Sequence, residues 1–194
     1  VPSADGSWHA EVSGAFTRWG GYRSTFPSGG YTTRADIYLD VTAGLANDTR
    51  MDYSSAINDP SGGHRRDFIF HAGFYNSSDM TGPGAGTDRF VLNASNNSPG
   101  WPKNPAGSPV AVTVTGWYTV EHKFYDAGGG VLAVDINVYD PGSALVYSRT
   151  LSDPSDVIGS TVGGNRYGWF LNMGWSLPVD NTVIDTGSAL AVDN

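Results

Sequence analysis

The sequence contains no cysteine, and this absence excludes several kinds of chemistry at once. Disulfide bonds, thiol catalysis and zinc sites built from thiolates all require cysteine side chains. Lysine and glutamate, two strong helix formers, occur only twice each, which argues against a helical architecture. No apolar run approaches the roughly 18–20 residues that a membrane-spanning helix needs, so we expect no membrane span.

Positive charge is also scarce, because nine arginines and two lysines stand against nineteen acidic residues. The formal net charge of −8 disfavours nucleic acid and anionic membranes as partners. Aspartates supply the oxygen ligands that calcium prefers; Asp40 lies near the end of the predicted strand 33–41, and Asp140 follows the predicted strand 131–139. Calcium at Asp40 and Asp140 is therefore a candidate cofactor, and we expect no other.

The start of the chain and its loops bear on where the protein works. The sequence begins with Val1 and has no hydrophobic signal core, so we interpret it as a mature or trimmed product. Its loops are rich in Gly, Asn, Ser and Asp. We expect a secreted or cell-surface protein.

Residues 65–75 show the alternation of a β-strand. Phe68 and Phe70 alternate with His71, and further along the strand with Tyr75. A period of two places successive side chains on opposite faces of a sheet. One face of this strand is therefore an aromatic core, and the other is half-buried filler or the floor of a binding groove.

Residues 33–41 repeat the pattern, with Arg34 and Tyr38 among the polar positions. Turn residues separate about eleven such short strands along the chain. Because strands of this kind bury only one face, we predict an all-β fold, an antiparallel two-sheet β-sandwich of the jelly-roll type.

The predicted domain covers residues 14–194 and follows a loose N-terminal segment at residues 1–13. Its first strand is expected at residues 14–19. Residues 153–158 hold the one predicted helical turn, because Asp153 is a good N-cap residue and a proline follows it.

The predicted strands at residues 33–41, 66–75, 117–125 and 131–139, with the closing segment VDNTVI at 179–184, resemble the concanavalin A-like (laminin G-like) jelly rolls. The chain is also similar in texture to uncharacterised secreted bacterial proteins. The jelly-roll resemblance implies a lectin, a carbohydrate-binding module, a glycosidase, a polysaccharide lyase or an adhesion protein. Fold alone leaves these functions open.

The segment IFHAGFYNS at residues 69–77 resembles, more narrowly, the YFKAGxYNQ strand of the alginate-lyase jelly rolls. His71 stands where that family has lysine, Ser77 replaces glutamine, and the family's companion motifs have no convincing match. A lyase needs a base and a cation that neutralises the uronate carboxylate. If the chain is such a lyase, the catalytic candidates are His71, Tyr75, Arg34 and His122.

Hydrolytic chemistries and metal sites find little support in the sequence. The only glutamates, Glu11 and Glu121, belong to no glycosidase motif. Asp36 and Asp40 share a strand face but would lie ~13 Å apart, too far for a catalytic carboxylate pair. There is no Gly-x-Ser-x-Gly elbow for serine catalysis, and the four histidines lack metal-ligand spacing.

Sugar binding demands less, namely an aromatic face for stacking and a few polar groups. Trp101 lies in a polar, proline-flanked loop and is the tryptophan most expected to be exposed. The candidate ligand-binding residues are Trp101, Tyr38, Arg34, His71, Tyr75, Asn93 and Asn172.

We therefore interpret the chain as an exported, lectin-like protein that binds a glycan or polysaccharide. Few lysines are available to keep its predicted edge strands from pairing with another chain. A self-assembling surface, filament or adhesion subunit is therefore the first alternative. A polysaccharide lyase of the alginate-lyase type is the second.

Overall fold

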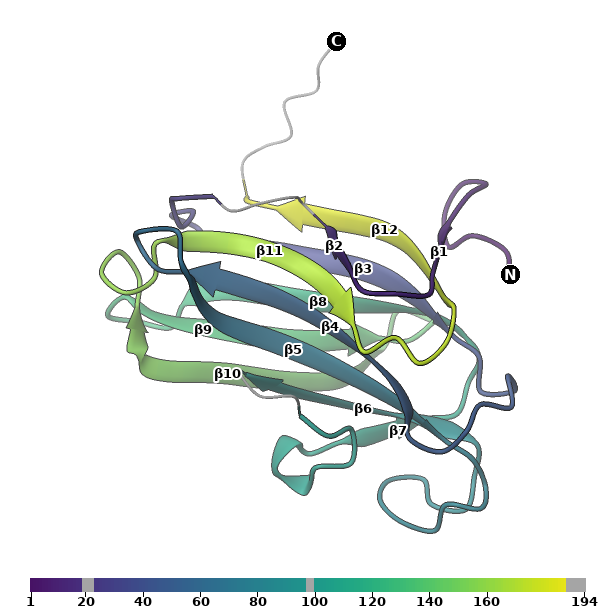
Figure 1. Ribbon diagram of the computed structural model, residues 1–194. Helices are drawn as coiled ribbons and strands as arrows, with labels where there is room; N and C mark the ends of the chain where they lie inside the picture. Colours follow the sequence, from purple (N-terminus) through teal and green to yellow (C-terminus); the bar gives the residue numbers. More distant parts are fainter. Residues whose placement is uncertain (19–22, 97–99, 188–194) are drawn as a thin grey trace.

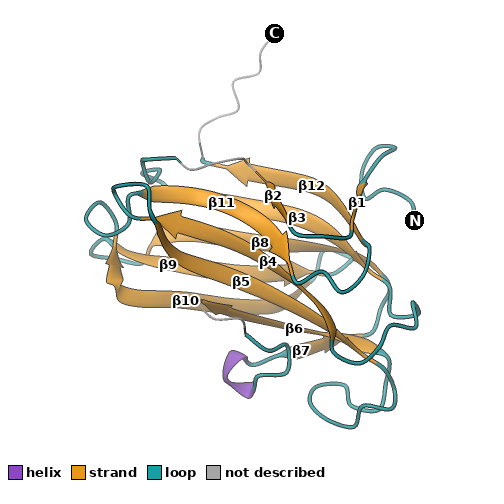
Figure 2. Cartoon of the chain, viewed as in Figure 1, coloured by secondary structure: helices purple, strands orange, loops and turns teal. Residues whose placement is uncertain are grey.

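The computed structural model describes residues 1–18, 23–96 and 100–187 and shows a nearly all-β chain. Two antiparallel six-stranded sheets face each other as a β-sandwich (Figures 1 and 2). Sheet A runs, in spatial order, β1 (Ala10–Val12), β12 (Leu177–Asp185), β3 (Tyr31–Leu39), β8 (Gly116–Asp126), β9 (Val131–Tyr139) and β10 (Leu145–Val157). Sheet B runs β2 (Phe16–Arg18), β11 (Gly164–Leu171), β4 (Thr49–Asn58), β5 (His64–Tyr75), β6 (Arg89–Asn96) and β7 (Val110–Val112).

Helical structure in these described ranges is limited to one turn of 3-10 helix, η1 (Pro105–Gly107), drawn in purple in Figure 2. No helix within them is long and apolar enough to cross a bilayer.

The inner faces of the two sheets form one aromatic core. Phe68 and Phe70 on β5 are fully buried, as the alternation of residues 65–75 predicts. Phe68 meets Phe124 of β8 edge to face, with ring centroids 5.5 Å apart. Phe124 in turn stacks on Tyr31 of β3 at 4.3 Å. The prediction of an antiparallel sandwich is confirmed.

Sheet B is buried on its outer face as well. On β4, Asp52 and Ser54 alternate with the core residue Tyr53, yet both are buried. The loop after β6 lies directly on the strands, because a methyl group added to Gly73 of β5 would come within 2.8 Å of the Pro102 ring. The described part of this loop, which includes η1, is seen beside β6 and β7 in Figure 1. Asp52 and Ser54 on this face are therefore enclosed rather than solvated.

The N-terminal segment, expected to be loose, is tied to sheet A. Ala10–Val12 pair with β12 and add a strand, which brings the number described to twelve. The indole nitrogen of Trp117 donates to the Pro2 carbonyl at 2.9 Å, and the amide of Ala4 donates to Asp180 at 3.0 Å. These contacts hold residues 1–12 against the sheet, a tertiary effect that local composition does not reveal.

The predicted helical turn at 153–158 is instead extended chain at the end of β10. The buried carboxylate of Asp156 accepts from Arg65 of β5 at 2.7 Å and also pairs with Arg66. These inter-sheet ion pairs override the local helix signal. At the other end of the chain, the predicted strand 14–19 corresponds to β2, and Trp19 lies outside the described residues.

Candidate functional site

The sandwich divides the predicted site residues between opposite faces. Arg34 and Tyr38 lie on the outer face of sheet A, since the residues that alternate with them on β3 are buried in the core. Most of the others gather on or beside the outer face of sheet B: His71 and Tyr75 on β5, Asn93 on β6, Asn172 just after β11 and Trp101 in the loop after β6. His122, on β8, points into the core between the sheets.

On the outer face of sheet B, three side chains from three strands form a hydrogen-bonded chain. Asp52 on β4 lies directly opposite His71 on β5, and their Oδ1 and Nδ1 atoms are 2.6 Å apart. The other ring nitrogen of His71, Nε2, is 2.8 Å from Oγ of Ser95 on β6. Asn172 donates its side-chain amide to the second carboxylate oxygen of Asp52. His71 and Asp52 are 0 % and 1 % exposed, respectively.

The backbone at Gly100 covers the hydrogen-bonded residues His71 and Ser95. A methyl group at Gly100 would lie 2.4 Å from His71 Nε2 and 2.8 Å from Ser95 Oγ, so no side chain fits there. The Gly100 carbonyl accepts from Arg50 Nη1 at 3.2 Å. The Arg50 guanidinium also lies over the ring of Trp101, 5.5 Å from its centroid. Trp101 is 44 % exposed, so the predicted exposed tryptophan borders the buried polar chain.

Asn93 holds the Trp101 loop in place. Its side-chain amide donates to three main-chain carbonyls, at 3.0 Å to Trp101, 3.1 Å to Pro102 and 3.0 Å to Asn104. Its own carbonyl oxygen accepts from Tyr147 of β10. Because these interactions engage both ends of the amide, Asn93 positions the loop rather than presenting a free group to a ligand.

Tyr75 is enclosed at the other end of β5. The ammonium of Lys103 lies 4.0 Å from the centre of its ring, and the guanidinium of Arg89 lies 5.5 Å away. Burial raises the pKa of the Tyr75 hydroxyl well above its usual value. The hydrogen bond from Lys103 is the main reason that the pKa of neighbouring Asp79 falls well below its usual range. In this arrangement Tyr75 is a packing residue beneath charged side chains.

Arg34 and Tyr38 belong to a separate, open surface on sheet A. The Tyr38 ring meets Trp117 edge to face at 5.4 Å. Arg34 is exposed and lies opposite Glu121 of β8, which accepts a hydrogen bond from Asn137 of β9. These residues cannot act on the same ligand atoms as His71, because the whole sandwich lies between them.

The two aspartates proposed as calcium ligands each stabilise a turn. Asp40 Oδ1 accepts from the amide and the hydroxyl of Thr42, and Asp140 Oδ1 accepts from the amides of Gly142 and Ala144. The described residues contain no group of three or more acidic or histidine side chains arranged to hold a metal ion.

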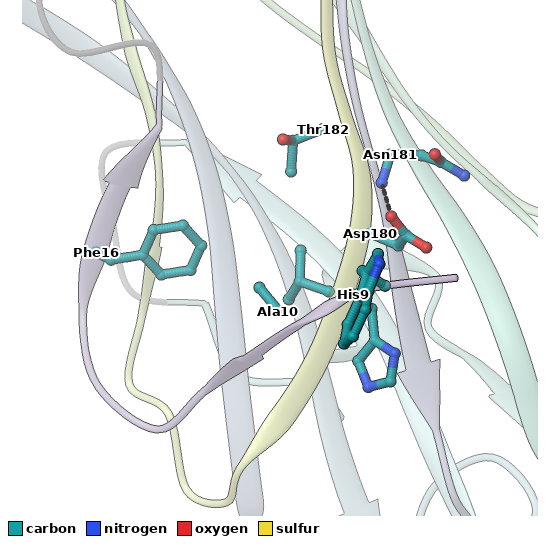
Figure 3. Close-up of a pocket in the computed structure, with 8 residues that line it drawn as sticks. His9, Ala10, Phe16, Asp180, Asn181 and Thr182 are labelled. Atoms are coloured by element: carbon teal, nitrogen blue, oxygen red, sulfur yellow. Dashed lines mark hydrogen bonds between the residues drawn. The ribbon is translucent and has the colours of Figure 1, made fainter. Parts of the chain in front are cut away.

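A hollow of about 490 Å³ lies between β1, β2 and β12, and sequence reasoning did not find it. Trp8, which is 87 % exposed, lines it together with Ala10 and Phe16. Figure 3 shows Phe16 and Ala10 at this hollow, with the Asn181 amide donating to Asp180 beside them. The hollow lies between the edge strands β1 and β2 and the neighbouring β12, which only the tertiary fold brings together.

Sequence reasoning also missed Asp52, Ser95 and Arg50. A signal was present for Asp52, since it stands between the apolar residues Met51 and Tyr53 of β4. Its meaning depends on cross-strand register, which places it opposite His71.

Comparisons with known proteins leave the chain without an assigned family. A scan against protein-family models finds no match, and a search of curated proteins finds none either. Among solved structures, the fold is similar to a mutant of alginate lyase Aly36B in complex with an alginate trisaccharide. The TM-score is 0.41 and the identity 10 %, over 80 % of this chain and 69 % of that one. At this level of similarity the likeness assigns neither a reaction nor a ligand to this chain.

Proposed function

We propose that this protein binds glycans through Trp101 and the polar groups beside it, and that it does so at or outside the cell surface. The observation that carries the proposal is an exposed indole on a backbone segment that hydrogen bonds anchor. Asn93 fixes the Trp101 carbonyl, and Arg50 covers the ring and bonds to the preceding residue.

Such an indole suits a sugar. The apolar C–H face of a pyranose packs on an aromatic face, while its hydroxyl groups need donors and acceptors nearby. Because Asn93 anchors the backbone of residues 101–104, little backbone entropy is lost when a ligand packs on the ring. Arg50 places a positive charge at this spot on a protein whose net charge is −8, so polymers with carboxylate groups belong among the ligands tested.

The test is a glycan-array screen, run once with calcium and once with chelator, on protein whose mass in solution is known. The proposal expects binding that Trp101→Ala removes. Trp8→Ala is the matched control, because Trp8 is exposed on a different part of the molecule. Loss of binding in Trp8→Ala alone would move the site to the hollow between β1 and β12. No binding to any glycan, together with particles far larger than 20.5 kDa, would favour a self-assembling subunit instead.

A lyase is distinguished by turnover. Cleavage of a uronate polymer by elimination leaves unsaturated ends that absorb in the ultraviolet. The proposed binding function predicts that absorbance stays flat when the protein is mixed with alginate.

A further inference from the structure

We propose that Ser95, His71 and Asp52 form a nucleophilic triad that cleaves carboxylic esters, with Ser95 as the nucleophile. This proposal rests on the chain of hydrogen bonds across β4, β5 and β6 and does not depend on glycan binding. The distances from His71 to Ser95 and to Asp52, 2.8 and 2.6 Å, are within hydrogen-bond reach, as a base that serves a nucleophile and is oriented by a carboxylate requires.

The partners of His71 determine which nitrogen can act as the base. An ionised carboxylate only accepts hydrogen bonds, so Nδ1 of His71 carries the proton that faces Asp52. Nε2 is then free of hydrogen in the neutral ring and accepts from the Ser95 hydroxyl. Asn172 donates to the second oxygen of Asp52, which helps to fix the plane of the carboxylate.

The three residues of the proposed triad differ in how deeply they are buried. His71 and Asp52 are almost fully enclosed, so water does not compete for their hydrogen bonds. Ser95 is half-buried and is the least enclosed of the three residues. Gly100 lies directly over the His71–Ser95 pair and leaves no space for a side chain there.

The chemistry balances without any metal or redox partner. Ser95 Oγ attacks the ester carbonyl carbon while its proton passes to His71 Nε2. The bond from that carbon to the alcohol oxygen then breaks, and the alcohol leaves with the proton from Nε2. Water repeats the sequence on the acyl-serine, giving the carboxylic acid and restoring the Ser95 hydroxyl. Asp52 keeps the ring oriented and stabilises the transient imidazolium.

Covalent labelling tests the proposal on the full chain. A fluorophosphonate probe loses fluoride when a serine oxygen attacks its phosphorus, and peptide mass spectrometry then locates the label. The proposal expects the label on Ser95 and hydrolysis of p-nitrophenyl acetate by the wild-type protein. Absence of label at Ser95 would overturn it.

Variants separate catalysis from a structural role. Ser95→Ala should lose at least about 10³-fold in the rate of ester hydrolysis while keeping the wild-type melting temperature. Asp52→Asn should lower kcat with little change in KM and should alter the pH profile. Ser152→Ala is the control, because its hydroxyl donates to the Leu132 carbonyl on sheet A. A Ser95→Ala rate equal to that of wild type would refute the triad, and glycan binding can be measured separately in each variant.

Discussion

His122 provides a sharp test of how the core is built, because an imidazole is enclosed there among aromatic rings. It is fully buried on β8, meets Tyr53 edge to face at 5.2 Å and donates from Nε2 to the Phe68 carbonyl at 3.1 Å. Burial lowers the pKa of His122 to about 3, since a charged ring cannot be solvated at this position.

The sign of the effect on stability follows from that pKa. In the unfolded chain the imidazole has a pKa of about 6.5. Below this pH the unfolded state therefore binds a proton that the folded state does not bind. Stability is therefore complete above about pH 6.5 and is lost as the pH falls toward 3. Between pH 7 and pH 4 the linkage relation gives a loss of about 3 kcal/mol from this one residue.

The perturbation is His122→Gln, which keeps a donor for the Phe68 carbonyl but cannot titrate. Urea unfolding of both proteins at pH 7 and pH 4 gives the four free energies required. The wild type should lose about 3 kcal/mol more than His122→Gln across this interval. His9→Gln, which removes a histidine near the surface, should behave as the wild type does. Equal pH dependence in wild type and His122→Gln would refute the buried, neutral imidazole.

Three further predictions concern the loops and the ion pairs. Arg89→Met should lower the free energy of unfolding by about 3 kcal/mol, because the buried guanidinium holds Asp79 and three carbonyls of its loop. Asp156→Asn should cost about 2 kcal/mol in the same urea assay, since it weakens charged hydrogen bonds to two arginines. Gly100→Ala should weaken both glycan affinity and fluorophosphonate labelling, because the added methyl collides with His71.

Each of these three predictions can be contradicted by a specific result. Arg34→Met, at an exposed arginine on sheet A, should change stability little, and an equal loss from both arginine variants would remove the special role of Arg89. An Asp156→Asn protein as stable as wild type would mean that the ion pairs contribute nothing. Unchanged ligand binding and labelling in Gly100→Ala would show that Gly100 does not define the space above His71.

The fold could be predicted largely because alternation is local. Phe68 and Phe70 are buried as the pattern of residues 65–75 indicates, and Arg34 and Tyr38 face outward. The end of β10 could not be predicted this way. There, the attraction of Asp156 to arginines of the opposite sheet outweighs a local helix signal.

The candidate site was predictable only in part, because it depends on register between strands far apart in sequence. Trp101 was found from its polar, proline-flanked surroundings. His71 was found as a polar residue on a strand, but its partners Asp52 and Ser95 lie on other strands and are brought together only by pairing of β4, β5 and β6. The same limit explains why Arg34 was grouped with His71, although the sandwich places them on opposite faces.

Calorimetric titration of the strongest glycan from the array tests the central claim, which is that Trp101 carries ligand binding. Wild type, Trp101→Phe, Trp101→Ala and Trp8→Ala are compared under one set of conditions. The account predicts a loss of about 2 kcal/mol or more in Trp101→Ala, a smaller loss in Trp101→Phe and no change in Trp8→Ala. Wild-type affinity in Trp101→Ala would contradict it.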